Sequence, residues 1–115
     1  MQTSSFQFNR EHPFKKPVSV AFVSPLDFKG REYILLKPYA TEYGKFRRGE
    51  MSEEEYSEYY NEEILGGLSP EGVYKDLGSD STLLCWEPSG KFCHRRLIAE
   101  WLERNICIKI PEVWL

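Results

Sequence analysis

The chain has 115 residues, of which 41% are hydrophobic and 15% aromatic, which suits one folded domain and excludes general disorder. The formal net charge of −3 gives no bulk attraction to nucleic acid or to an anionic membrane. No apolar run reaches the roughly 20 residues that span a bilayer, and the opening MQTSSFQFNR lacks the apolar region of a secretory signal. These features predict a soluble cytoplasmic protein with no membrane partner.

The first half of the chain gives mixed signals. Residues 1–17 contain scattered aromatic residues and two prolines, which fits either a strand or an irregular N-terminal arm. Residues 18–24, VSVAFVS, are β-branched and apolar and predict a strand that stops at Pro25. Residues 27–32 predict a turn, and residues 31–39 predict either a short strand or part of a loop.

Two helices are predicted in the middle of the chain. Ser52 and Glu55 form a capping-box pattern, and an approximately helical apolar stripe follows until Gly66 and Gly67. Residues 69–71, Ser-Pro-Glu, then offer an N-cap, a proline at the first helical position and an acidic first turn. We expect this second helix to run to residue 77 and to end at Gly78.

The last third predicts a βαβ unit. Residues 81–87, STLLCWE, are apolar on both faces, as in a central parallel strand, and residues 88–90 predict a turn. Residues 93–104 predict a helix with one apolar stripe, and residues 105–110, NICIKI, predict a further strand. We therefore predict a single α/β domain over residues 1–115, with three layers, a mostly parallel sheet and a C-terminal βαβ unit.

The segment from Cys85 to Arg96 is the predicted site. Ligands of open α/β sheets bind where strands end and helices begin, and a helix N-terminus favours an anion or a thiolate. Helical spacing turns His94 towards the sheet and places Arg96 on the solvated face beside Glu100, while Arg95 reaches either solvent or the crevice. As the last residue of the predicted strand, Glu87 is expected at the crevice rim.

Several simpler interpretations stay open. Cys85 in a buried strand can be a small hydrophobic residue, and Cys93 and His94 can be packing residues. Cys107 is interpreted as structural, and an odd count of three cysteines does not suggest a disulfide framework. A basic-aromatic cluster is interpreted as a solvated loop rather than an RNA contact, so nucleic acid is not an expected partner. It comprises Tyr39, Tyr43, Lys45, Arg47 and Arg48.

The string LLCWEPSGKFCHRRLIAEWLE closely resembles the signature of the family called domain of unknown function 488 (DUF 488). The resemblance covers residues 83–103 well, and YSEYYNEEIL and the closing IPE are similar to the family's preceding helix and its end. The residues that match the motif are Cys85, Glu87, Cys93, His94 and Arg95. Longer members carry an Asp-Val-Arg motif that is missing here. Because the family has no settled activity, the resemblance implies a site rather than a reaction.

Three functions remain open. The first is a site for an anionic, nucleotide-like small molecule, held by the helix N-terminus and Arg95, with Cys85 and Lys91 as further ligand-binding residues. His94 and Glu87 would orient the ligand or act as acid and base. The second is a thiol-dependent enzyme with Cys93 as nucleophile. The third is a non-enzymatic sequestering or interaction protein.

Metal binding is a weaker interpretation of the same residues. Cys85, Cys93 and His94 offer three ligands and Glu87 a fourth. The sequence has no Cys-x-x-Cys pair, however, and adjacent helical residues diverge by about 100°. The prediction therefore assigns no metal ligand and no cofactor.

Overall fold

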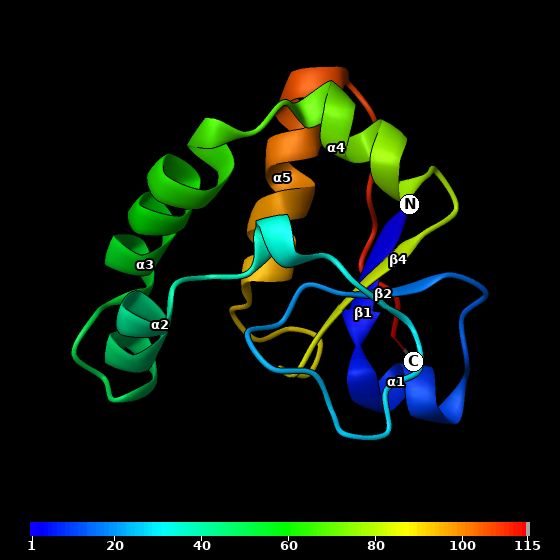
Figure 1. The fold of residues 1–115 in the computed structure, drawn as a ribbon, viewed down its shortest axis with the longest axis horizontal. Coiled ribbons are helices and arrows are strands. Elements are labelled where there is room, and N and C mark those ends of the chain that lie inside the picture. The colour runs from blue at the N-terminus through cyan, green and yellow to red at the C-terminus, as the bar shows by residue number, and fades with distance from the viewer. Residues whose placement is uncertain (115) are drawn as a thin grey trace.

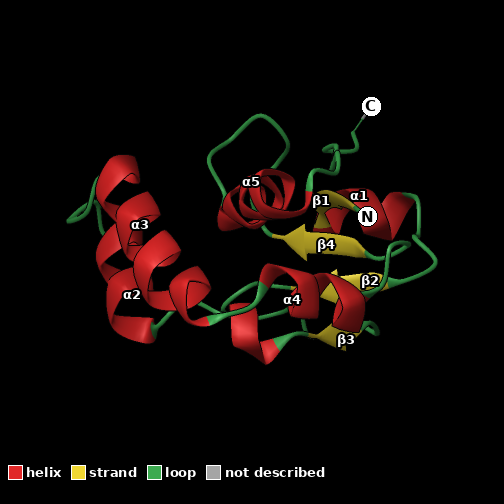
Figure 2. Ribbon diagram, turned by 90° about the horizontal axis from the view of Figure 1, so that it is seen from above, coloured by secondary structure: helices red, strands yellow, loops and turns green. Residues whose placement is uncertain are grey.

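The computed structural model describes residues 1–114, which form an α/β domain around one four-stranded sheet. All of its strand pairs are parallel, and Figure 2 shows the strands side by side in the order β1-β4-β2-β3. The strands are β1 (Gln2–Ser5), β2 (Pro17–Ser19), β3 (Arg31–Glu32) and β4 (Thr82–Cys85). The predicted fold class, with β4 as a buried central strand, is confirmed.

Helices cover both faces of the sheet (Figures 1 and 2). On one face, Leu83 of β4 shares the main core with α4 (Pro70–Leu77) and α5 (His94–Ile106). On the other, Leu84 packs in a smaller cluster with Phe6, the first residue of α1 (Phe6–Glu11). Successive residues of a strand point to opposite faces of the sheet. Because β4 is apolar on both faces, helices can pack on both sides of it, and this gives the three predicted layers.

A helical arm stands at one end of the sheet, beyond α5, in both views (Figures 1 and 2). It consists of α2 (Ala40–Arg47) and α3 (Glu53–Tyr59), which continues as a π-helical stretch (Tyr60–Ile64) and a 3-10 turn (Leu65–Gly67). The solvated loop expected around residues 39–48 is wrong, because α2 forms there. Its Phe46 packs against Tyr56, but the helix buries no residue fully, so no apolar stripe reveals it in the sequence.

The predicted helix starts are confirmed. The Ser52 hydroxyl accepts from the Glu55 N–H at 3.1 Å, and the Glu55 carboxylate accepts from the Ser52 N–H at 2.9 Å. The Ser69 hydroxyl caps α4 by accepting from the Gly72 N–H at 3.1 Å, and Gly78 ends that helix with φ of 93°, a backbone angle that favours glycine. Helix caps depend on residues only a few positions apart, so the sequence predicts these helix ends correctly.

The predicted strands in the first 40 residues are shorter than expected. Residues 2–5 form β1, so the strand interpretation holds there and the irregular arm does not. The strand expected over residues 18–24 ends at Ser19, although the Val20 N–H still donates to the Leu84 carbonyl at 3.1 Å. Within residues 31–39, a two-residue strand is followed by a 3-10 turn (Ile34–Leu36).

The strand predicted over residues 105–110 is wrong. Helix α5 continues to Ile106, and Cys107 ends it in the left-handed conformation with φ of 56°. The chain then turns back to the sheet and reaches it two residues beyond Ile110, where Glu112 forms a single parallel bridge with Thr3 of β1. The predicted crossover is therefore closed by one bridge instead of a full strand.

No helix among residues 1–114 is both long enough and apolar enough to cross a membrane.

Two buried tyrosines of the α3 segment make a matched test of this core. The Tyr60 hydroxyl donates to the Leu36 carbonyl at 2.5 Å, whereas the Tyr56 hydroxyl is buried without a partner among the described residues. Tyr60→Phe should lower the free energy of unfolding by about 1–3 kcal/mol because the carbonyl loses its donor. Tyr56→Phe should be neutral or stabilising. Urea unfolding of both variants checks this, and equal losses would contradict it.

Candidate functional site

The loop between β4 and α5 brings the predicted site together. Cys85 is the last residue of β4, and Cys93 is the N-cap of α5. Between them the chain makes the predicted turn, with the Lys91 N–H donating to the Pro88 carbonyl at 3.2 Å and Gly90 at φ of 90°. The loop therefore returns the chain beside the end of β4, as expected for a site at the carboxyl end of a parallel strand.

Two thiols and an imidazole form a buried cluster at this point. One ligand atom from each of Cys85, Cys93 and His94 lies within 4.8 Å of the others. None of the three residues is more than 4% exposed. The inward orientation predicted for His94 is confirmed, and its ring stacks on Tyr60 with centroids 5.2 Å apart.

Hydrogen bonding orients the His94 ring. Its Nε2 lies 2.6 Å from the Val20 carbonyl oxygen. A carbonyl oxygen accepts hydrogen bonds and does not donate them, so Nε2 carries the proton. In the neutral ring Nδ1 then keeps a lone pair, and it lies 3.9 Å from the Cys85 Sγ.

Glu87 lies at the edge of this cluster, as predicted, although it is not a strand residue. β4 ends at Cys85, two residues earlier. One Glu87 carboxylate oxygen lies 3.4 Å from the Cys85 Sγ, so the thiol donates to it, and the other lies 4.0 Å from Nη1 of Arg47. The Glu87 side chain is 23% exposed, which makes it the link between the buried thiols and solvent.

Cys93 has the wrong surroundings for an activated nucleophile. Burial, together with the neighbouring Cys85 thiol, raises its pKa well above the ordinary value for cysteine, and this outweighs the opposing effect of His94 and Arg95. A thiolate is the reactive form of cysteine. The structure therefore disfavours the thiol-dependent enzyme.

Arg95 reaches neither solvent nor a crevice, in contrast to both expectations. Its side chain is 1% exposed and binds the carboxylate of Glu112 through Nε at 3.1 Å and Nη2 at 2.7 Å. Thr3 and Ser89 donate their hydroxyls to the same carboxylate at 2.5 and 2.6 Å. Burial alone would raise the pKa of Glu112, but the hydrogen bonds from Arg95, Ser89 and Thr3 hold it below its usual value.

Glu112 is the residue that the sequence did not assign. It lies seventeen positions after Arg95, beyond the range of any helical or strand periodicity. The one signal was the similarity of the closing IPE to the DUF 488 pattern.

The prediction that Arg96 is a solvated surface residue is wrong. It is half-buried, and its Nη1 donates to the Thr3 hydroxyl and to the Ile110 carbonyl, both at 2.8 Å. The chain after α5 folds back over the first turn of that helix to reach β1, and so covers a position that helical spacing alone assigns to solvent.

A cavity of about 620 Å³ opens beside the first turn of α5. Lys91 and Arg96 supply cations to its wall, and Phe92 and Trp114 supply aromatic rings. Gly90, Glu53 and Glu112 complete the lining. Of the predicted ligand-binding residues, Lys91 therefore lines a cavity, whereas Cys85 and Arg95 are buried behind it.

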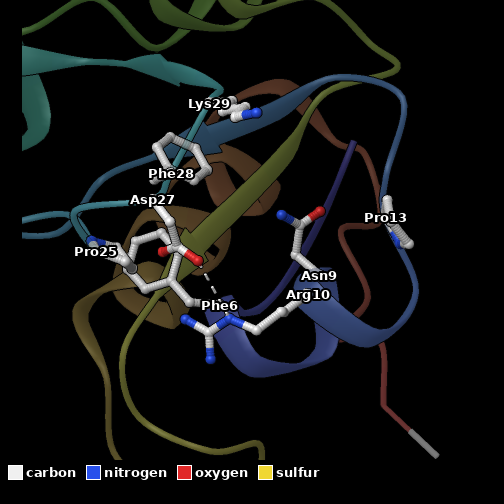
Figure 3. Close-up of a pocket in the computed structure, with 8 residues that line it drawn as sticks. All are labelled: Phe6, Asn9, Arg10, Pro13, Pro25, Asp27, Phe28 and Lys29. Carbon is white, nitrogen blue, oxygen red and sulfur yellow. Dashed lines mark ion pairs between the residues drawn. The ribbon is translucent and has the colours of Figure 1, made fainter.

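A second cavity, of about 340 Å³, lies between α1 and the loop at residues 25–29 (Figure 3). Arg10 and Asp27 face each other across it, with Nε and Oδ2 3.7 Å apart. Both side chains are more than half exposed, and such exposed pairs contribute little. None of the predicted site residues lines this cavity.

Comparison with protein-family models, with curated proteins and with solved structures finds no match to the chain. The assignment to DUF 488 therefore stays a prediction that rests on the motif residues.

Alkylation tests the state of the cysteines. In native protein near neutral pH, iodoacetamide should label the exposed Cys107 and leave the buried Cys85 and Cys93 unmodified until the protein is unfolded. Peptide mass spectrometry after timed quenching gives the three rates separately. Cys93 labelling as fast as Cys107 would restore the thiol-enzyme hypothesis.

Glu112→Gln tests the buried ion pair. Because it leaves the Arg95 charge buried without its partner, we expect a loss of roughly 3–5 kcal/mol in the free energy of unfolding at pH 7. The exposed Glu58→Gln is the matched control and should stay within about 0.5 kcal/mol of wild type.

The pH dependence of this loss has a definite sign. The pKa of Glu112 is lower in the folded chain than its ordinary value of 4.5, so the unfolded state takes up protons first as the pH falls. Its contribution is complete above that value and is lost as the pH falls through the folded pKa. The gap between wild type and Glu112→Gln should therefore narrow below pH 4.5, and a gap that widens there would contradict the assignment.

Proposed function

We propose that the protein binds a small anionic, nucleotide-like molecule in the cavity at the start of α5. The observation that carries the proposal is the cavity of about 620 Å³ with two cationic and two aromatic side chains in its wall. Ligand sites are commonly about 300–1,000 Å³ in volume and combine apolar walls with a few polar groups. Lys91 and Arg96 suit a phosphate, and Phe92 and Trp114 suit a ring system.

The charges around the cavity support an anion. Glu112 lies in the wall, but its carboxylate is already paired with Arg95. Arg96 makes its two hydrogen bonds within residues 1–114 through Nη1, so Nε and Nη2 remain available to a ligand. Glu53 is the other carboxylate in the wall. In this proposal Arg96 has the anion-binding role that we predicted for Arg95.

The start of α5 follows directly on the residues of the cavity wall. Its N-cap, Cys93, makes no side-chain hydrogen bond to the helix, whereas Ser5, Ser52 and Ser69 cap α1, α3 and α4. The first N–H groups of a helix have no partner within it, and they favour anions. Gly90, Lys91 and Phe92, which line the cavity, lead directly into this helix start.

Two aromatic rings are placed for stacking. Phe92 is held from behind by Phe46 and Tyr56, with centroids 5.4 and 6.1 Å away. Trp114 is 58% exposed, so its ring is open to a ligand in the cavity. Stacking of a base on an aromatic side chain is worth about 1–3 kcal/mol.

The same geometry favours binding over covalent catalysis. Cys93 is buried with a raised pKa, and the Glu112 carboxylate is engaged by Arg95, Ser89 and Thr3. We therefore propose a ligand-sequestering protein rather than a thiol enzyme.

Thermal shift and calorimetric titration with AMP and with adenosine test the proposal, because the pair differs by one phosphate. AMP should raise the melting temperature more than adenosine does. Inorganic phosphate and ADP-ribose serve as further probes of the anion and of a larger ligand. Incubation followed by chromatography of the ligand shows whether any of these is turned over.

Matched lysine variants locate the binding. Lys91→Gln should weaken AMP binding about tenfold, the equivalent of one charge-assisted hydrogen bond. Lys109→Gln, at an equally exposed lysine beyond the other end of α5, should leave it unchanged. No shift with any probe, or equal losses in both variants, would overturn the proposal.

A further inference from the structure

The buried cluster of Cys85, Cys93 and His94 is separate from the cavity, since none of the three residues lines it. Cysteine thiolates and histidine imidazoles are the usual protein ligands of Zn²⁺, and a structural site has four ligands in a tetrahedron. Their ligand atoms lie within 4.8 Å of one another, and all three residues are buried. We propose that Cys85, Cys93 and His94 bind one Zn²⁺ ion.

The backbone lets the adjacent side chains of Cys93 and His94 point to one place. Two successive helical residues would diverge by about 100°. Cys93 is instead the N-cap of α5, with extended backbone angles of φ −154° and ψ 143°, and His94 is the first helical residue. Their side chains can therefore turn to one point, as the separation of at most 4.8 Å shows.

The distances suit an ion after a small contraction. A tetrahedral ion with Zn–S bonds of about 2.3 Å and Zn–N bonds of about 2.0–2.1 Å places its ligand atoms roughly 3.5–3.8 Å apart. Cys85 Sγ lies 3.9 Å from Nδ1 and 4.0 Å from Nε2 of His94, so the thiol must move towards the Nδ1 side of the ring to share an ion with it. Any pair of ligand atoms as far apart as 4.8 Å must move about 1 Å closer to bind one ion. Rotation of the cysteine side chains can supply this movement.

The surroundings of His94 match those of a metal ligand. Nε2 donates to the Val20 carbonyl, so the ring is fixed and the lone pair is left on Nδ1. Metal-binding histidines characteristically donate their other ring N–H to a backbone carbonyl or a carboxylate in this way. Stacking on Tyr60 holds the ring from one side.

Glu87 lies beside the cluster and offers a candidate fourth ligand. Its Oε2 lies 3.4 Å from Cys85 Sγ, and carboxylate oxygen is an accepted zinc ligand. Such an ion would join the end of β4 to the start of α5 and fix the loop at residues 86–92. Because the cluster is enclosed by Phe6, Ala21 and Leu84, we assign the ion a structural role and no part in catalysis.

Cobalt substitution in the whole protein tests this directly. Reduced wild-type protein, freed of metal with a chelator, should bind one equivalent of Co²⁺ and show thiolate-to-cobalt charge-transfer and tetrahedral d–d absorption. Zn²⁺ should remove these bands and raise the melting temperature. Cys85→Ala and Cys93→Ala should weaken binding by more than about 100-fold, beyond the cost of losing a supporting hydrogen bond.

The exposed Cys107→Ala is the matched control and should bind as wild type does. Native mass spectrometry of the wild type supplies a second readout that does not depend on whether the variants fold, since one zinc should add its mass less that of two thiol protons. Absence of the cobalt bands in reduced wild type, or bands that survive loss of Cys85 or Cys93, overturns the proposal. So does a Cys85–Cys93 disulfide that re-forms in place of metal uptake.

Discussion

The ion pair between Arg95 and Glu112 is the interaction on which the arrangement of the site depends. A fully buried guanidinium is tolerated only with a partner, and here the partner comes from the C-terminal segment and is shared with Thr3 of β1 and Ser89 of the β4–α5 loop. One carboxylate thereby joins a strand, a loop, a helix and the tail. The tail lies across the first turn of α5 because this carboxylate has to reach Arg95.

Because the tail is held there, the two candidate functions occupy separate places. In front of the tail, Lys91, Arg96 and two aromatic rings surround a cavity. Behind the first turn of α5, the thiols and His94 are closed off from solvent. The loop at residues 86–92 forms the boundary between them. A metal ion bound by the thiols and His94 would hold this loop in place, and would therefore also set the position of Lys91 and Phe92 in the cavity wall.

Sequence reasoning worked where the deciding interaction is local. The caps at Ser52 and Ser69, the central strand at residues 82–85 and the inward turn of His94 all follow from residues a few positions apart. It failed where a distant segment intervenes. Nothing near Arg96 in the sequence announces that Ile110 and Thr3 will cover it, and nothing marks Glu112 as the partner of Arg95. The exposed helix α2 has no apolar stripe that would reveal it in the sequence. The alternating apolar residues at 105–110 predict a strand, although the chain there only approaches the sheet.

The place of β1 in the sheet has a consequence for how the chain reaches this structure. β1 pairs with β4, so Gln2 meets Thr82, and Thr3 forms a bridge with Glu112. During synthesis β1 therefore has no strand to pair with until the 80 residues up to Thr82 have been made. Contacts of such long sequence separation slow folding, and an unpaired strand is open to association with other chains in the meantime. Helix α1 follows the same order, because its buried Phe6 packs against Leu84 of that later strand.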